Sequence, residues 1–104
     1  MHVDSEAPFE LQIAAAPTLD KLIRIAKKSG CLKNEAGQPF DFGHLEALIQ
    51  LPPNARLSVL QSAEVLFTKM LGDIPETGGF RAKLIKLFFK ELRERTQQAP
   101  LNKN

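Results

Sequence analysis

The sequence predicts an all-α protein: a small irregular bundle of four principal helices preceded by a short amino-terminal helix. Apolar residues recur at helical spacing in five segments, and Gly or Pro ends most of these segments. The chain has 104 residues, 43% hydrophobic and 25% charged, an ordinary globular composition that provides one core. We therefore expect a single helical domain over residues 1–104, with mobile ends at 1–6 and 99–104.

The first predicted helix is short and lies between two prolines, over residues 8–16. Pro8 suits a first helical turn, Asp4 and Ser5 can cap it, and Pro17 stops it. We expect this segment to dock on the other helices through one apolar face, which contains Phe9, Ile13 and Ala16.

The second predicted helix covers residues 18–29. Thr18 has the side chain of a helix cap, and Gly30 supplies the left-handed residue that ends many helices. One face is apolar and the other is basic, although Lys27 and Lys28 also complement the dipole at the helix end. The basic cluster, extended by the following loop, contains Lys21, Arg24, Lys27, Lys28 and Lys33.

A polar connection over residues 31–40 follows, with its tightest turn at 34–37. A small hairpin is the alternative, but one of this length is too short to be stable by itself. We interpret the segment as a loop anchored by Leu32 and Phe40.

Two further helices are predicted at 41–51 and 54–71, separated by a Pro-Pro pair that terminates the first of them. Asp41 and Asn54 are the natural caps. In the second helix the apolar side chains span roughly 200° of a helical wheel, which makes it the expected central helix. They are Leu57, Val59, Leu60, Ala63, Leu66, Phe67, Met70 and Leu71.

The last predicted helix, residues 80–98, has two different surfaces. Its apolar side chains cover roughly 200° of the wheel, twice the stripe that a surface helix needs. They are Phe80, Leu84, Ile85, Leu87, Phe88, Phe89 and Leu92. The remaining arc holds a basic strip, diluted by Glu91 and Glu94, that consists of Lys83, Lys86, Lys90 and Arg93.

This helix leads to the main functional hypothesis, a non-enzymatic protein-interaction module of the adaptor, chaperone-like or regulatory kind. Apolar anchors would be buried against a protein partner or a second copy, and the cations would steer an acidic surface towards them. The predicted partner-binding residues are Phe80, Lys83, Leu84, Lys86, Leu87, Phe88, Phe89, Lys90 and Arg93. The competing interpretation is that the bundle itself covers both wide apolar arcs.

The alternative function is a small nucleic-acid-binding regulator that uses the basic faces of helices 18–29 and 80–98. The formal net charge of only +2 is modest for a protein that neutralises many phosphates. Residues 41–51 and 54–71 also have the arrangement of a helix-turn-helix. The outward side chains of its second helix are polar but nearly uncharged: Ser58, Gln61, Ser62, Val65, Thr68 and Lys69.

No catalytic residue, metal site, cofactor or small-molecule substrate is predicted. Cys31 and His44 are the single pair that a nucleophilic mechanism can use, and each has a plainer role as a small hydrophobe or a surface residue. Gly78 and Gly79 precede a helix, where backbone amides can bind an anion, but the sequence ETGGFRAK lacks the Walker A spacing.

A cytoplasmic location is expected, without membrane insertion. No stretch approaches the ~20 apolar residues that span a bilayer. The chain starts with an acidic, proline-broken segment instead of a secretory signal, and its single cysteine excludes an internal disulfide.

Overall fold

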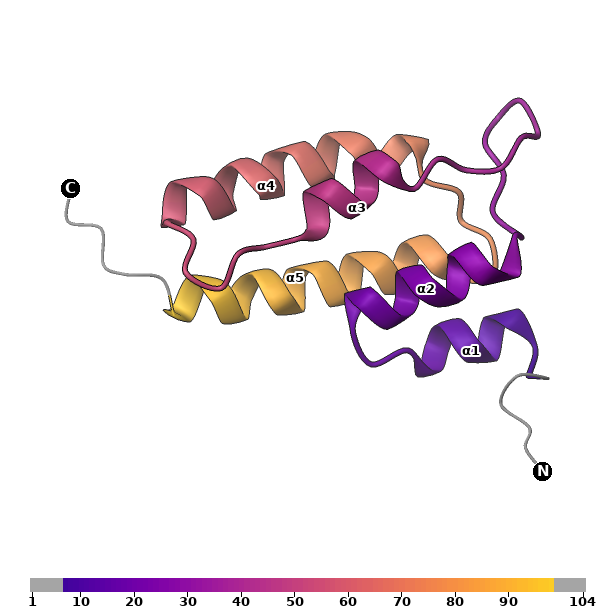
Figure 1. Cartoon of the computed structure of the whole chain (residues 1–104), viewed down its shortest axis with the longest axis horizontal. Coiled ribbons are helices and arrows are strands. Elements are labelled where there is room, and N and C mark those ends of the chain that lie inside the picture. Colours follow the sequence, from indigo (N-terminus) through magenta and orange to yellow (C-terminus); the bar gives the residue numbers. More distant parts are fainter. Residues whose placement is uncertain (1–6, 99–104) are drawn as a thin grey trace.

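The structure is a computed structural model that describes residues 7–98, and this part of the chain is all-α (Figure 1). The elements are α1 (Phe9–Ala15), α2 (Leu19–Ser29), α3 (Gly43–Ile49), α4 (Leu57–Met70), a 3-10 turn η2 (Leu71–Asp73) and α5 (Phe80–Gln98). The predicted fold class is therefore confirmed. The predicted caps Asp4 and Ser5 and the expected mobile ends 1–6 and 99–104 lie outside the described residues.

The longest helix, α5, occupies the centre of the fold. It packs against α1, α2 and α4, whereas α3 packs against α4. Figure 1 shows α3 and α4 on one side of α5 and α1 and α2 on the other. One hydrophobic core runs between these helices, and α5 contributes more buried residues to it than any other element.

The ends of α1 and α2 follow the local signals in the sequence. The Thr18 hydroxyl accepts a hydrogen bond from the Lys21 amide at 3.2 Å, which satisfies a free donor of the first turn. Gly30 ends α2 with φ 67°, a conformation that favours glycine. The predicted face of α1 is confirmed as well, because Ile13 and Ala16 are buried and Phe9 packs against the core.

The starts of α3 and α4 differ from prediction. Neither helix begins at its predicted cap: α3 follows Phe42 and α4 follows Arg56, without a side-chain cap in either case. Asp41 still accepts a hydrogen bond from the Gly43 amide at 2.9 Å. Asn54 lies in a turn that the prolines impose, and the extended backbone of Arg56 (ψ 156°) delays the helix.

Residues 31–40 form the predicted loop, anchored by the buried Leu32 and the partly buried Phe40. The two anchors are joined by a hydrogen bond of 3.1 Å from the Phe40 amide to the Leu32 carbonyl, and one isolated bridge links Lys33 to Pro39. Asn34 closes the tip, because its side-chain oxygen accepts hydrogen bonds from two amides of the turn.

Phenylalanines connect the core to its periphery. The ring of Phe67 in α4 stacks on Phe88 in α5, with centroids 3.9 Å apart, and Phe89 meets both rings edge-on. At the other end of α5, Phe42 meets Phe80 edge-on at 6.4 Å. These contacts fix α4 and the start of α3 to the central helix.

Two arginines of α5 hold the connections between helices. Arg81 donates to the carbonyls of Leu71 and Ile74, at 3.5 and 3.3 Å, and so secures the connection from α4 to α5. Arg95 donates to the Leu51 carbonyl at 3.0 Å and secures the connection from α3 to α4. The guanidinium groups thus bond backbone carbonyls in both connections and hold these segments against α5.

Candidate protein interface

The predicted apolar anchors of α5 are core residues. Phe80, Leu84 and Phe88 are completely buried, and Leu87 is 5% exposed. Of the five predicted anchors, Phe89 alone is partly exposed, and its ring packs against the core. In the folded chain the four buried residues therefore present no surface at which this apolar arc could meet a partner.

The reason is the number of neighbours that α5 has. Three helices, α1, α2 and α4, surround it, so that an arc of roughly 200° is covered within the chain. The sequence contained both possibilities, because the width of an apolar arc does not say whether neighbouring helices or a partner cover it.

The predicted cations of α5 have local roles in two cases. Lys83 donates to the Ala14 carbonyl at 2.6 Å, which ties α5 to the end of α1. Lys90 pairs with Glu94, one helical turn away, at 3.6 Å. Lys86 and Arg93 are exposed, and neither forms an ion pair with another residue in the described part of the chain.

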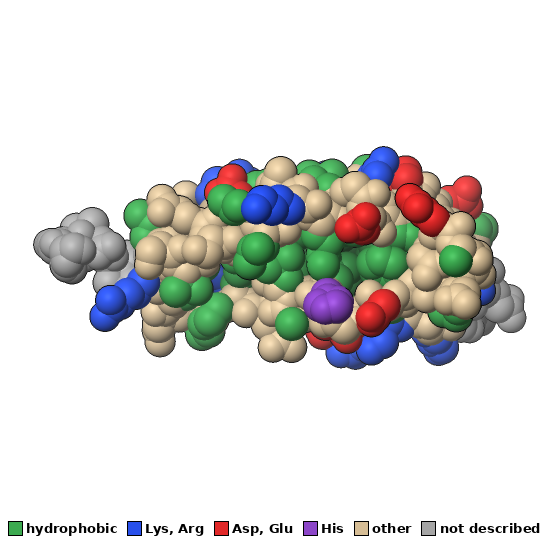
Figure 2. Space-filling view, turned by 90° about the horizontal axis from the view of Figure 1, so that it is seen from above, with side chains coloured by type: hydrophobic (Ala, Val, Ile, Leu, Met, Phe, Trp, Pro, Cys, Tyr) green, Lys and Arg blue, Asp and Glu red, His purple; other side chains and the backbone are tan. Residues whose placement is uncertain are grey.

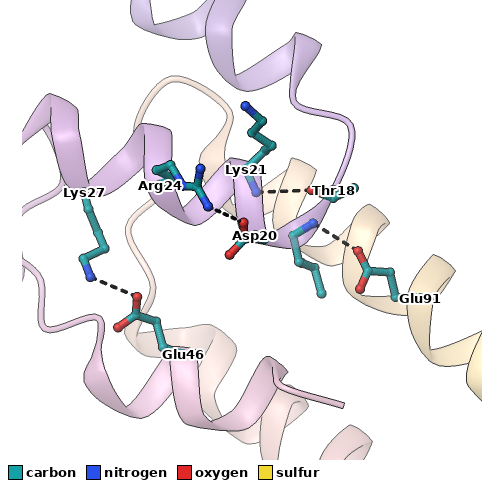
Figure 3. A network of polar contacts seen from close by, with 8 residues as sticks. Thr18, Asp20, Lys21, Arg24, Lys27, Glu46 and Glu91 are labelled. Atoms are coloured by element: carbon teal, nitrogen blue, oxygen red, sulfur yellow. Dashed lines mark hydrogen bonds and ion pairs between the residues drawn. The ribbon is translucent and has the colours of Figure 1, made fainter. Parts of the chain in front are cut away.

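The basic cluster of α2 is likewise partly neutralised (Figure 3). Arg24 pairs with Asp20 at 2.7 Å, and Lys27 reaches across to Glu46 of α3 at 3.0 Å. The two helices are neighbours, and four of their cations are paired with carboxylates: Arg24, Lys27, Arg81 and Lys90. A dedicated phosphate-binding surface keeps its cations free for the backbone of the nucleic acid.

Cys31 and His44 are not brought together as a catalytic pair. The thiol of Cys31 is exposed and contacts the Ser29 carbonyl at 3.9 Å, whereas His44 lies in a groove that Cys31 does not line. Residues 7–98 also contain no group of three His, Cys, Asp or Glu side chains that could hold a metal ion.

The amino end of α5 is occupied by the protein itself. Glu76 accepts a hydrogen bond from the Ala82 amide at 3.1 Å, in the place where an anion would bind. A Cβ atom at Gly78 would lie 2.6 Å from the ring of Phe9, so this turn is covered by α1. Gly78 thus allows α1 to pack closely against this turn, and a carboxylate of the protein itself takes the place that an anion could occupy.

Most of the exposed large apolar side chains in residues 7–98 lie on α4 instead. Val59, Val65 and Leu66 of this helix are 47%, 54% and 55% exposed, whereas Leu11, 60% exposed on α1, stands alone. Neutral side chains accompany them, because Ser58, Gln61, Ser62, Val65 and Leu66 line a shallow depression. We call Ser58, Val59, Ser62, Val65 and Leu66 the outer face of α4.

This face is rigid and almost free of charge. On the wheel its five residues share an arc of roughly 120° that includes one charged residue, Lys69, at the carboxyl end. The opposite side of α4 is fixed by the buried side chains of Leu60, Ala63 and Phe67. The arrangement resembles a helix that lacks one of its neighbours.

Part of this face had a signal in the sequence. The outward side of this helix is nearly uncharged and includes Val65, which is unusual for a side in contact with water. No sequence pattern indicated that Val59 and Leu66 are exposed. On the wheel both belong to the apolar arc that is expected to face the core. Only the positions of α3 and α5 decide which part of that arc is covered.

Within residues 7–98 every helix is too short or too polar to cross a bilayer. Fold and surface together define a small all-α protein with one unusually neutral helix face. Comparisons with protein-family models, with curated proteins and with solved structures gave no match.

Proposed function

We propose that the protein is a non-enzymatic interaction module, of the adaptor, chaperone-like or regulatory kind, that binds a partner protein on the outer face of α4. The observation that supports this proposal is the group Val59, Val65 and Leu66, each about half exposed on a helix that is otherwise well packed. Exposed apolar patches with neutral surroundings are typical of protein interfaces. The proposed apolar contact surface is therefore on α4, whereas the sequence pattern had indicated α5.

The free energy gained by burying this face limits the affinity of the interaction. Covering the exposed half of three Val or Leu side chains contributes about 3 kcal/mol. Micromolar binding needs about 8 kcal/mol. The partner must therefore also contact the surrounding polar side chains, among them Ser58, Gln61 and Ser62, or the complex is short-lived.

Site-specific photo-crosslinking tests this proposal. A photo-reactive amino acid at position 65 should give an adduct of one defined mass in cells, and the same group at Lys28, exposed on α2, should give none. Leu66→Glu should abolish the adduct, because a charge is then placed in the apolar contact. An adduct of twice the 11.6 kDa chain mass identifies a homodimer.

The stability of the Leu66→Glu variant is the necessary control. Leu66 is 55% exposed, so the free energy of unfolding should change by no more than about 0.5 kcal/mol. Loss of the adduct from a folded variant supports the interface. An adduct that survives the substitution, or that forms equally at position 28, rejects it.

Nucleic-acid binding, the alternative predicted from the basic helix faces, has less support. Lys27, Arg24 and Lys90 are paired with carboxylates, and the most neutral helix face is the one that a helix-turn-helix would present to DNA. For the location of the module we propose the cytoplasm, where a single exposed thiol such as Cys31 stays reduced.

A further inference from the structure

A groove at one end of the molecule is separate from the outer face of α4. It lies where the loop over residues 31–40, the start of α3 and the connection from α4 to α5 meet, and it has a volume of about 490 Å³. Figure 2, which looks onto the side that carries α3 and α4, shows apolar surface there, bordered by acidic side chains and a histidine. Its size falls within the range of ligand-binding pockets.

The floor of this groove is apolar and well supported. Ile74 is 2% exposed, while Phe40, Met70 and Pro75 are partly buried around it. Phe40 is held by an edge-on contact with Phe42 at 5.0 Å, and the Ile74 carbonyl accepts a hydrogen bond from Arg81. The groove is thus preformed, which lowers the entropy cost of binding.

The rim of the groove is acidic. Glu35, Asp41 and Asp73 line it together with one cation, Lys33, and with His44. In residues 7–98 none of these three carboxylates forms an ion pair, although elsewhere in the protein such pairs do form. The carboxylates with a cation partner are Asp20, Glu46, Glu76 and Glu94.

We propose that this groove binds a peptide segment of a partner protein in which a large apolar side chain is flanked by Lys or Arg. The apolar side chain fits the floor around Ile74, and the flanking cations fit the unpaired carboxylates on the rim. An anionic ligand such as a nucleic acid is repelled. The carboxylates are too dispersed for a metal ion, since no group of three potential ligands lies together in the described residues.

Fluorescence anisotropy with three labelled peptides tests the chemistry of the groove. The first has a central Leu-Phe pair between lysines, the second has glutamates in place of the lysines, and the third has serines in place of Leu-Phe. We expect the first to bind, with an affinity that falls as salt rises because exposed charges are screened. The second should not bind, and the third should bind at least about tenfold more weakly because it lacks apolar burial.

Two double variants test whether the carboxylates on the rim of the groove contribute to peptide binding. Asp41→Asn with Asp73→Asn should weaken binding of the lysine peptide by roughly 3- to 10-fold, the effect of losing two exposed charge pairs. Asparagine at position 41 can still accept from the Gly43 amide. The matched control is Glu10→Gln with Glu64→Gln, which removes the same charge from two exposed carboxylates, outside the groove, that form no ion pair in residues 7–98.

Three results would overturn this proposal: no binding of the lysine peptide at millimolar concentration, equal loss of affinity in the control variant, or equal binding of the glutamate peptide. Self-association that the aspartate variant abolishes, without peptide binding, would identify a second copy as the occupant instead. Leu66→Glu should leave peptide binding unchanged, so that this test and the test of the α4 interface fail independently.

Discussion

Gly78 lies where the turn before α5 packs against α1, two segments that are distant in sequence. Its φ is 61°, and a Cβ atom would lie 2.6 and 2.9 Å from two ring carbons of Phe9. The glycine therefore has two reasons to be there: the left-handed backbone and the close approach of α1. The sequence marks the first, because paired glycines indicate a turn, but not the second.

We expect Gly78→Ala to destabilise the protein more than Gly37→Ala. Both glycines have positive φ, so each alanine costs about 1–2 kcal/mol in backbone strain. At Gly37 no atom lies within 4 Å of the added Cβ, whereas at Gly78 the ring of Phe9 must move. Urea unfolding of the two variants measures the difference, and equal losses would show that α1 gives way without cost.

Phe67 and Leu66 are adjacent in sequence but differ completely in environment. Phe67 is fully buried and stacked on Phe88, while Leu66 is 55% exposed. Phe67→Ala should therefore cost about 3–5 kcal/mol through lost burial and a cavity. Leu66→Ala should stay within about 0.5 kcal/mol. Thermal or urea unfolding checks both, and a large loss at Leu66 would mean that the outer face of α4 is part of the core.

At the level of elements, α2 is capped twice, once locally and once by a distant helix. Thr18 accepts from the Lys21 amide, and Glu91 of α5 accepts from the Leu19 amide at 3.1 Å (Figure 3). A carboxylate at this position also favours the positive end of the helix dipole. Glu91, which only dilutes a basic strip on the helical wheel, thus joins the two helices.

Replacing Glu91 by Ala should weaken the first turn of α2 by about 1 kcal/mol, the usual value of a lost cap. Hydrogen exchange of the Leu19 amide should become faster, while exchange at the buried centre of α5 changes little. Glu91→Gln is the matched variant, since its amide oxygen still accepts but carries no charge. If exchange at Leu19 is unaffected in the Ala variant, the cap does not contribute.

The two helices with wide apolar arcs differ in how much of the arc is buried, because they have different numbers of neighbouring helices. The longer one, α5, is surrounded by three helices, whereas α4 packs against α3, α5 and the turn η2. The seven residues of α3 also cover little of the fourteen-residue α4. Local patterns predicted both arcs but not which of them the chain itself covers, because coverage depends on neighbours from elsewhere in the chain.

At the scale of the whole molecule, the protein is a thin slab. Its shortest extent is 18 Å, about two helix diameters. In such a shape several helix faces necessarily meet the solvent, and the outer face of α4 does so with exposed apolar side chains. The positive charges, by contrast, are distributed over α2 and α5 and partly paired.

We expect no salt-dependent binding to duplex DNA or RNA. The net charge is +2, and carboxylates pair with Arg24, Lys27 and Lys90 on the two basic helices, which weakens the positive field that a phosphate backbone would meet there. Titration of labelled duplexes at about 20 and 200 mM salt, a range in which phosphate contacts weaken strongly, measures this directly. Binding at the lower salt that disappears at the higher would restore the nucleic-acid alternative.

Local sequence patterns were sufficient to predict the all-α class, the bounds of α2 and α5 and the loop between α2 and α3. These features depend on short-range physics: hydrophobic periodicity, the Thr18 cap, the Gly30 terminator and the helix-stopping prolines. The predicted starts of α3 and α4 were wrong. Phe42 packs on Phe80 ahead of α3, and the prolines delay the start of α4.

Contacts between distant segments set which apolar surface stays exposed and which charges stay unpaired. Burial of Leu87 and exposure of Leu66, two leucines in similar helical patterns, result from the helices that lie next to them. The acidic groove combines Glu35 and Asp41, from the connection between α2 and α3, with Asp73, from the distant segment between α4 and α5. Surfaces of this kind depend on long-range packing, which no local pattern encodes.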